Sequence, residues 1–262
     1  MIIGNSFIYN GKSSDIYGLR FLSVNTNENK EIGGVLEYTT FKGNKFPNTI
    51  IQEVSYNSVF EIEVEIISEH KLDNNIDEIY NWLLNQPDYK KLYINNNDDF
   101  YYNCVFTSAS YIDGGGIDGW GIYGIKATMK CDSTFMWKDV EYTYTSAELV
   151  DVVTHDNISN VREYTYPTEF VIKTGESGGN ITVQNISDNN RLTSFSNTLA
   201  NDTITLFCFP ALVKSYLNDN DNLVYETFNK NFFRLLQGTN KIGIIGDIDE
   251  ITIKYKIGRL VS

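Results

Sequence analysis

The stretch Phe60–Ile66 reads Phe-Glu-Ile-Glu-Val-Glu-Ile, in which an apolar residue alternates strictly with glutamate. Because successive side chains of a β-strand point to opposite faces, this period of two predicts a strand with one buried face and one face in water. The side chains of Glu61, Glu63 and Glu65 would then project together into solvent. The pattern favours a β fold, and the segments on either side support the same interpretation.

A single amphipathic helix is predicted shortly after this strand. Apolar side chains recur there at helical spacing and form one stripe, made of Ile76, Ile79, Tyr80 and Leu83. The Asp-Asn-Asn run at residues 73–75 offers side chains that can cap the helix N-terminus. Pro87 ends the helix, because proline cannot continue its hydrogen-bond ladder. Trp82 lies beside the stripe, and we expect it to pack into the core, as we do for Trp137.

Strands flank the helix in the first half of the chain. Residues 92–94 and 100–106 are apolar and aromatic runs on either side of an Asn- and Asp-rich turn, which predicts a hairpin. A second hairpin is predicted between a strand that ends near Ile112 and the run 121–130, around a glycine-rich connection. The first half is therefore expected to be β-rich with one helix.

The pattern changes after Trp137. A polar stretch is followed by short strand-like runs at regular intervals: residues 170–173, 181–185, 203–209, 223–225, 242–245 and 251–257. Regularly spaced short strands without a convincing amphipathic helix are typical of a β-sandwich. We therefore predict a mainly β protein with two domains, residues 1–137 and residues 138–262.

The composition excludes several classes of protein. Among 262 residues, 34 acidic and 21 basic side chains give a net charge of −13. A general affinity for DNA, RNA or anionic lipid needs a cationic surface, so we expect no stable nucleic-acid binding. No apolar run approaches the roughly 18 residues needed to span a bilayer, and the N-terminus lacks the features of a signal peptide. We expect no membrane insertion and a protein made in a cytoplasm.

The sequence offers little for redox or metal chemistry. Cys104, Cys131 and Cys208 are odd in number and lack a CxxC spacing, so we predict buried free thiols in a reducing compartment. The run Asp219–Asn222 is similar to the start of a calcium loop, but the glycine and glutamate that complete such a loop are missing. We expect a turn there, and no metal-binding residues.

Catalytic motifs occur only as isolated patterns. The run Gly114–Gly119 matches the glycine pattern of dinucleotide sites, but a strand is predicted after it where such a site needs a helix N-terminus. The run Gly175–Gly179 matches the nucleophile elbow around Ser177. The histidines are His70 and His155, and neither follows that serine as the elbow requires. We predict no enzyme activity and no catalytic or cofactor-binding residues.

Four segments occur in order along nearly the whole chain: Phe7–Asp15 with Tyr17–Leu19 at the opening, Ile79–Leu83 with Tyr89–Leu92 around the helix, Cys131–Trp137 at the end of the first domain, and Phe233–Ile242 in the second. Together they resemble landmarks of the distal tail protein (Dit) family of long-tailed phages. Thr134 stands where the family usually has proline. The specificity lies in the order and spacing of the four segments.

The resemblance implies a structural hub at the tail tip or baseplate. Residues 1–137 would assemble into a hexameric ring through strand edges or the segment 24–58, and residues 138–262 would form a galectin-like β-sandwich outside it. The implied partners are the tail tube protein, the tail-tip protein and, in many phages, receptor-binding proteins for host attachment. The protein would be made in the host bacterial cytoplasm and reside in the virion tail tip.

Two groups of residues are candidates for roles in such a hub. Structural roles are expected for Trp82, Trp137, Gly238 and Asn240. Candidates for lining the channel through which DNA would leave the ring are Glu61, Glu63 and Glu65. These like charges, taken as unpaired, repel one another and are tolerated only where water or cations screen them, and a negative lining of the channel would repel phosphates. An ordinary solvent-facing surface is the simpler alternative for that strand.

Two other functions stay open at the level of sequence. The first is a cell-wall glycan-binding β-sandwich module, with exposed tyrosine or tryptophan rings as stacking platforms. The second is a cell-wall enzyme, which the failed motifs disfavour. A secreted lectin would need an export signal, whereas a virion protein leaves the cell by lysis.

Overall fold

The computed structural model describes residues 5–22, 35–40, 49–55, 60–94, 99–146, 148–161, 164–208, 211–215, 222–223 and 225–260. Most of the predicted turn before Phe100 and of the run Asp219–Asn222 lies outside these residues, as does much of the segment 24–58. The chain divides into two compact units, the first ending at Trp137 and the second running from Lys138 to Arg259.

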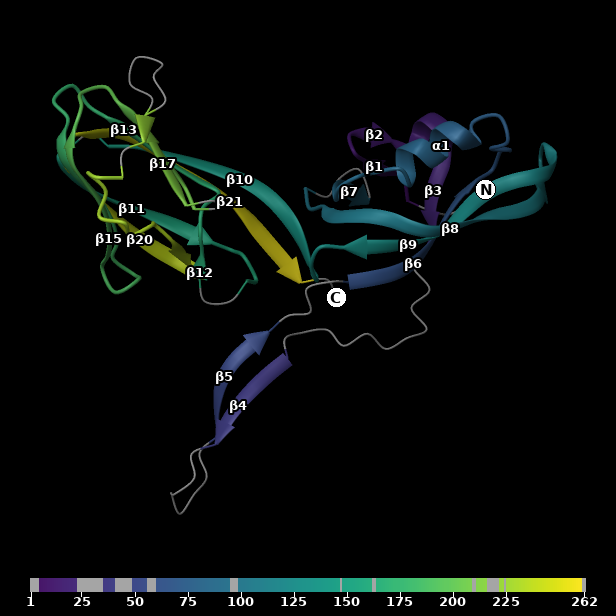
Figure 1. Ribbon diagram of the computed structural model, residues 1–262, viewed down its shortest axis with the longest axis horizontal. Coiled ribbons are helices and arrows are strands. Elements are labelled where there is room, and N and C mark those ends of the chain that lie inside the picture. The colour runs from purple at the N-terminus through teal and green to yellow at the C-terminus, as the bar shows by residue number, and fades with distance from the viewer. Residues whose placement is uncertain are drawn as a thin grey trace. The chain divides into compact units, whose positions relative to one another are not determined.

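The first unit is built on a seven-stranded antiparallel sheet in the order β2-β1-β7-β8-β9-β6-β3. Its elements are β1 (Phe7–Tyr9), β2 (Lys12–Ser13), the short 3-10 helix η1 (Ser14–Tyr17), β3 (Leu19–Leu22), β6 (Phe60–Ser68), α1 (Ile76–Leu83), β7 (Lys90–Ile94), β8 (Tyr102–Gly116) and β9 (Gly119–Cys131). Strands β4 (Val35–Thr40) and β5 (Thr49–Ser55) pair with each other as a separate two-stranded sheet. Figure 1 shows α1 lying over one face of the larger sheet.

The core of the first unit forms where α1 meets this sheet. Ile79 and Leu83 of the helix are buried together with Phe7 of β1 and Leu92 of β7. The predicted stripe is wrong at one position, because Tyr80 is 48% exposed and Trp82, at 7%, takes its place on the buried face. The stripe rule gives spacing only, whereas the sheet decides which side of the helix it covers.

The start of α1 also differs from the prediction. Asn75 occupies the N-cap position but makes no side-chain capping hydrogen bond. The Asp73 carboxylate instead accepts a hydrogen bond from the main-chain N–H of Ile122 on β9, at 3.1 Å. The acidic side chains of Asp77 and Glu78 in the first turn favour the positive end of the helix dipole.

The second unit contains two larger antiparallel sheets, as a β-sandwich requires. One has the order β10-β21-β13-β16-β17-β18 and the other β11-β20-β14-β15, with β12 and β19 paired separately. The strands are β10 (Phe135–Thr145), β11 (Val150–Asn157), β12 (Tyr164–Thr165), β13 (Glu169–Thr174), β14 (Gly179–Asn185), β15 (Arg191–Thr198), β16 (Thr203–Phe207), β17 (Leu212–Ser215), β18 (Asn222–Leu223), β19 (Leu235–Leu236), β20 (Gly238–Ile245) and β21 (Ile248–Leu260).

No strand was predicted in the polar stretch after Trp137, and this expectation is wrong, because β10 and β11 occupy that stretch. Both strands expose many of their side chains, so their sequences lack the apolar alternation that marked the other strands. The sandwich core consists of inward-facing side chains from both sheets, including Phe170, Ile172, Leu206, Ile251, Ile253, Val183, Ile242 and Ile244. The prediction of a mainly β protein with one α-helix is confirmed for the described part of the chain. Within that part, no helix is long and apolar enough to cross a membrane.

Candidate assembly surfaces

Among the described residues of the first unit, the long hairpin of β8 and β9 carries the most exposed large apolar side chains. Its strands pair from Cys104 opposite Cys131 to Gly116 opposite Gly119, and Figure 1 shows the ribbon extending past the helix to a free end. At that end, here called the hairpin tip (residues 114–121), Ile117 is 79% exposed and Trp120 is 76% exposed. Ile117 and Trp120 were not predicted to have a role, although large apolar side chains in a glycine-rich turn can indicate an interaction surface.

The hairpin tip is held in place by the loop before α1. The carboxylate of Asp118 accepts a hydrogen bond from the main-chain N–H of Lys71 and lies 3.1 Å from Nδ1 of His70. The Lys71 hydrogen bond is the largest cause that lowers the pKa of Asp118, followed by the contact with His70. Together with the Ile122–Asp73 hydrogen bond described above, these contacts fix the tip. Its two apolar side chains are therefore presented on ordered backbone, which lowers the entropy cost of a contact with another surface.

The glycines of the tip serve the turn geometry. Gly119 has a φ of +88°, a conformation that L side chains rarely adopt. A Cβ on Gly116 would lie 2.5 Å from the ring of Tyr123, whose hydroxyl donates to the carbonyl oxygen of Gly119 at 2.6 Å. The segment that follows is strand β9, so the dinucleotide pattern at Gly114–Gly119 lacks the helix N-terminus that would hold a pyrophosphate.

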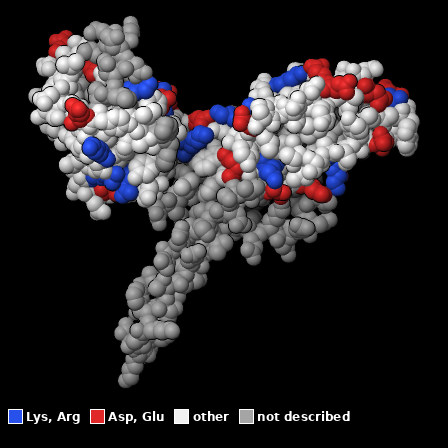
Figure 2. Space-filling view, in the orientation of Figure 1, with Lys and Arg blue, Asp and Glu red and all other residues white. Residues whose placement is uncertain are grey.

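The acidic strand β6 faces β9, and two of its glutamates are paired. Glu61 lies opposite Lys130 with a 2.6 Å ion pair, and Glu63, which lies opposite Thr128, reaches diagonally to Lys126 with one of 3.1 Å. The assumption of unpaired like charges is therefore wrong for these two residues, and with Glu65 this part of the face carries three carboxylates against two ammonium groups. The register between strands, which sequence spacing does not give, creates the pairs. Over the face of the molecule seen in Figure 2, acidic and basic side chains are likewise interspersed.

The two tryptophans named from the sequence have different environments. Trp82 is buried, and its ring stacks on Phe7 with a centroid distance of 5.8 Å and an interplanar angle of 1°. Trp137 is half-buried instead of fully packed. Its indole N–H donates to the Ser133 hydroxyl at 3.0 Å, and its main chain exchanges two hydrogen bonds of 2.8 Å with Tyr101. Trp137 thus fastens the end of the first unit mainly through hydrogen bonds.

Gly238 and Asn240 shape the entry to β20 in the second unit. Asn240 is fully buried, and its side-chain amide donates to the carbonyl oxygens of Leu236 and Gly238, both at 2.9 Å. Its Oδ1 accepts from the Leu236 N–H at 2.8 Å and from the Asn185 amide at 2.9 Å. Gly238 has a φ of +86°. Every polar atom of the Asn240 side chain therefore serves to hold this turn.

His155 and Ser177, the two remaining residues of the catalytic patterns, are both held by hydrogen bonds within the second unit. His155 is 2% exposed, and its ring nitrogens contact the hydroxyls of Tyr144 at 2.7 Å and Tyr255 at 2.9 Å. Burial lowers the pKa of His155, against an opposing effect of Asp156. Both nitrogens of this imidazole are therefore engaged by tyrosine hydroxyls. The main-chain N–H of Ser177 instead donates to the Asp247 carboxylate at 2.6 Å, in a turn before β14.

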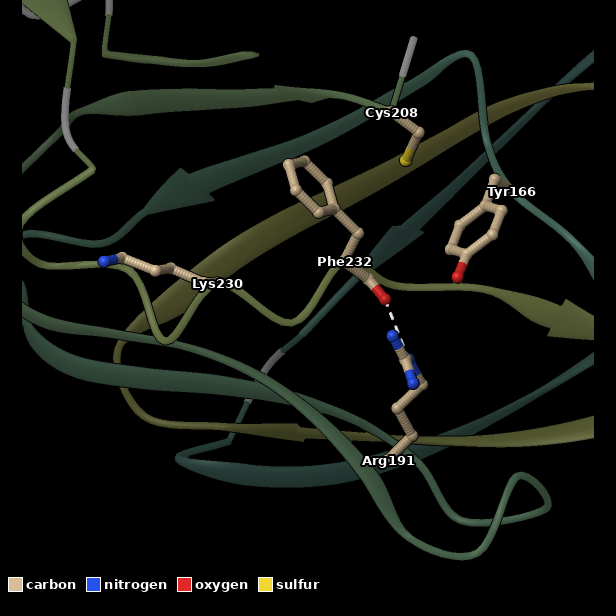
Figure 3. A pocket seen from close by; sticks show the side chains of 5 residues that line it. All are labelled: Tyr166, Arg191, Cys208, Lys230 and Phe232. Atoms are coloured by element: carbon tan, nitrogen blue, oxygen red, sulfur yellow. Dashed lines mark hydrogen bonds between the residues drawn. The ribbon is translucent and has the colours of Figure 1, made fainter. Parts of the chain in front are cut away.

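A hollow of about 330 Å³ in the second unit is lined by Tyr166, Arg191, Cys208, Lys230 and Phe232. The Nε of Arg191 donates to the Phe232 carbonyl oxygen at 2.9 Å, and Figure 3 shows the Lys230 side chain directed away from that guanidinium. Burial raises the pKa of Cys208 to about 12, so its thiol is protonated at neutral pH and is a poor nucleophile. Among the described residues, no cluster of three or more His, Cys, Asp or Glu side chains is arranged to hold a metal ion.

Two family models place the protein in the class of phage tail proteins. Residues 2–133 match a family described as phage tail protein N-terminal domain, and residues 135–255 match one described as phage tail C-terminal domain. The chain therefore belongs to this phage tail protein family. The family resemblance read from the four sequence segments is confirmed.

Solved phage structures share this fold. The crystal structure of the SPP1 Dit protein, described as a paradigm of the hub adsorption apparatus in phages that infect Gram-positive bacteria, has a TM-score of 0.66 and 13% identity, covering 96% of this chain and 98% of that one. Two structures of the phage P2 baseplate in its activated conformation, with calcium or with strontium, give TM-scores of 0.50 and 0.52 at 10% identity. They cover 97% and 96% of this chain, and 98% and 97% of theirs. At these identities the likeness establishes the fold. No curated protein sequence matches the chain.

Proposed function

We propose that this phage tail protein is a non-enzymatic hub subunit of the tail tip or baseplate. In this role residues 1–137 form a hexameric ring, and residues 138–262 form a galectin-like sandwich outside it. The ring joins the tail tube protein to the tail-tip protein and to receptor-binding proteins. The observation that carries the proposal is the end-to-end likeness to a solved hub protein, which covers 96% of this chain and 98% of that chain.

The first unit has the surfaces that a ring subunit needs. Strands β2 and β3 are the edges of the seven-stranded sheet, and an edge strand presents main-chain groups that another chain can pair with, although Phe21 of β3 already exchanges two main-chain hydrogen bonds with Asn5. The hairpin tip adds Ile117 and Trp120 on ordered backbone. Buried apolar and aromatic anchors of this kind contribute most of the binding free energy at protein interfaces. We assign the tip to a contact within the tail assembly.

The second unit offers poor stacking platforms for the alternative, a glycan-binding role. The exposed aromatic side chains among its described residues are Tyr142 and Tyr164, at 38% and 39%. The Arg234 guanidinium lies 4.2 Å from the ring centroid of Tyr164, and Tyr142 packs on His155 at 4.7 Å. Because each ring already has a packed neighbour, these contacts favour a structural role for the second unit.

The proposal is tested on the full-length chain, alone and co-expressed with the tail-tip protein encoded by the same phage. Light scattering measures the mass, and electron microscopy shows whether rings form. We expect hexameric rings, at least in the presence of the partner. Only monomers under both conditions would contradict the hub role.

A matched pair of variants tests the hairpin tip. Ile117→Asp places a charge on the tip, whereas Ile158→Asp makes the same change at a comparably exposed site of the second unit, at 69%. We expect Ile117→Asp to weaken ring formation or partner binding at least tenfold while its melting temperature stays unchanged, and the control to assemble normally. Equal assembly of the two variants would show that the hairpin tip is not part of the interface.

A further inference from the structure

Cys104 and Cys131 lie directly opposite each other at the start of the β8–β9 hairpin. The next pair along, Asn103 and Asp132, is hydrogen-bonded through its main chain, because the Asp132 N–H donates to the Asn103 carbonyl oxygen at 3.0 Å. Hydrogen-bonded and non-hydrogen-bonded pairs alternate along an antiparallel ladder. The two cysteines therefore form a non-hydrogen-bonded pair, in which opposing side chains come closest.

The geometry of such a pair matches that of a disulfide. Cα atoms in a non-hydrogen-bonded pair are about 4.5 Å apart, and disulfides span Cα separations of roughly 4.4–6.8 Å. Both side chains are fully buried and both are free thiols. Burial raises the pKa of Cys104 well above its ordinary value, and hydrogen bonding and charge interaction with Cys131 raise it further.

We propose that Cys104 and Cys131 are a cross-strand oxidation site, reduced in the bacterial cytoplasm and bridged by a disulfide after the phage particle reaches an oxidising medium. With a small peroxide as oxidant, one thiolate attacks the O–O bond and becomes a sulfenic acid, while the peroxide leaves as water. The second thiol then attacks that sulfur, a second water leaves, and the S–S bond forms. The balance is two thiols and one hydrogen peroxide to one disulfide and two waters.

The bridge would lock the hairpin at its base. It closes the loop from residue 104 to residue 131, which contains the hairpin tip with Ile117 and Trp120. A force applied to the tip by a bound partner runs along β8 and β9, and a covalent link at their base prevents the strands from separating there. Because the thiols are buried and the Cys104 thiol is held protonated, oxidation awaits local opening of the pair. The two thiols therefore stay reduced during synthesis and assembly.

Cys208 provides an internal control. It lies in the second unit, it is a buried free thiol, and burial raises its pKa to about 12. Among the described residues it has no cysteine as a strand partner, because β16, the strand before it, pairs with the cysteine-free strands β13 and β17. It should stay reduced under conditions that oxidise the pair.

The full-length protein is purified under reducing conditions and then incubated with hydrogen peroxide, and free thiols are counted in denaturant by mass spectrometry after alkylation. We expect the count to fall from three to one, with a peptide cross-link between Cys104 and Cys131. The melting temperature of the first unit should rise by roughly 5–15 °C, because the link constrains the unfolded chain. Cys208→Ala should retain this rise, whereas Cys104→Ala and Cys131→Ala should lose it.

Three results would overturn the proposal. The thiols could all stay free after prolonged exposure, a cross-link could involve Cys208, or the bridged protein could melt at the same or a lower temperature than the reduced protein. Tail particles kept in aerated buffer provide a second readout that does not depend on any variant. There the 104–131 cross-link should accumulate with time, and its absence would show that the pair stays reduced in the virion.

Discussion

The indole nitrogen of Trp82 donates a hydrogen bond of 2.9 Å to the main-chain carbonyl oxygen of Tyr9. This bond joins helix α1 to strand β1 across 73 residues of sequence. The Trp82 ring also stacks on Phe7, and it lies tilted against the ring of Tyr17 at a centroid distance of 5.7 Å. One side chain thus fastens the helix to the sheet by packing and by a hydrogen bond.

Removal of that ring should unfold the first unit. Trp82→Ala deletes a buried aromatic side chain, which typically costs about 3–5 kcal/mol of unfolding free energy, and we expect little soluble protein. Trp82→Phe keeps most of the packing but loses the hydrogen bond, at a cost of about 1 kcal/mol. Chemical denaturation of both variants measures these costs. A soluble Trp82→Ala protein that melts cooperatively and lacks only partner binding would contradict the structural role.

The Asn240 network should be equally sensitive. Asn240→Ala removes the hydrogen bonds to the part-buried main-chain groups of Leu236 and to the buried Asn185 amide, and we expect a loss of about 3 kcal/mol in unfolding free energy. Lys241→Ala, at the neighbouring exposed position, serves as the control and should change stability by less than about 0.5 kcal/mol. Urea denaturation monitors both variants. Equal stability of the two would show that the turn does not depend on Asn240.

Thr134, which replaces the family's usual proline, has a buried hydroxyl without a hydrogen-bond partner in the described structure. Burying an unsatisfied hydroxyl costs free energy, so its removal should be favourable. We expect the nearly isosteric Thr134→Val to raise the unfolding free energy by about 1 kcal/mol. Ser133→Ala is the contrasting change, because the Ser133 hydroxyl accepts from Trp137 and its loss should destabilise. A Thr134→Val protein less stable than the wild type would contradict this account.

His155 should make the second unit sensitive to acid. Burial lowers its pKa in the folded state, so the unfolded chain binds the proton more readily. The resulting stability is fully present above the unfolded pKa of about 6.5 and is lost as the pH falls from there toward the folded pKa. We expect a steeper fall in melting temperature between about pH 7 and pH 5.5 for the wild type than for the non-titrating His155→Gln. Calorimetry measures both profiles, and parallel curves would exclude His155 as the cause.

The role of the acidic strand in a channel is still a prediction, and the ion pairs change how it is tested. Glu61→Lys would place a lysine directly opposite Lys130, and Glu63→Lys would place one diagonally beside Lys126; like charges directly opposite each other destabilise a sheet. Replacement of Glu61, Glu63 and Glu65 by glutamine removes the charge without that clash. If the strand lines the lumen, assembled particles should eject DNA more slowly than wild type. Normal assembly with an unchanged ejection rate would show that this face is a solvent-exposed surface without a role in the channel.

Local patterns along the chain determined the class of fold. The alternation in Phe60–Ile66 and the stripe from Ile76 to Leu83 gave a strand and a helix, because side-chain period follows directly from backbone geometry. The second hairpin was also predictable, since a glycine-rich turn lay between two β-prone runs. The order and spacing of four segments identified the family.

Tertiary structure alone decided which of these elements meet, and how. Strand register brought Lys126 and Lys130 opposite glutamates, and it set Cys104 against Cys131. The packing of α1 on the sheet turned Trp82 inward while Tyr80 stayed in water. β10 and β11 became strands without an apolar period, because pairing with β21 and β20 satisfies their main chains whatever their side chains are. A period within one segment fixes only which residues share a face, whereas their neighbours depend on pairing between segments distant in the sequence.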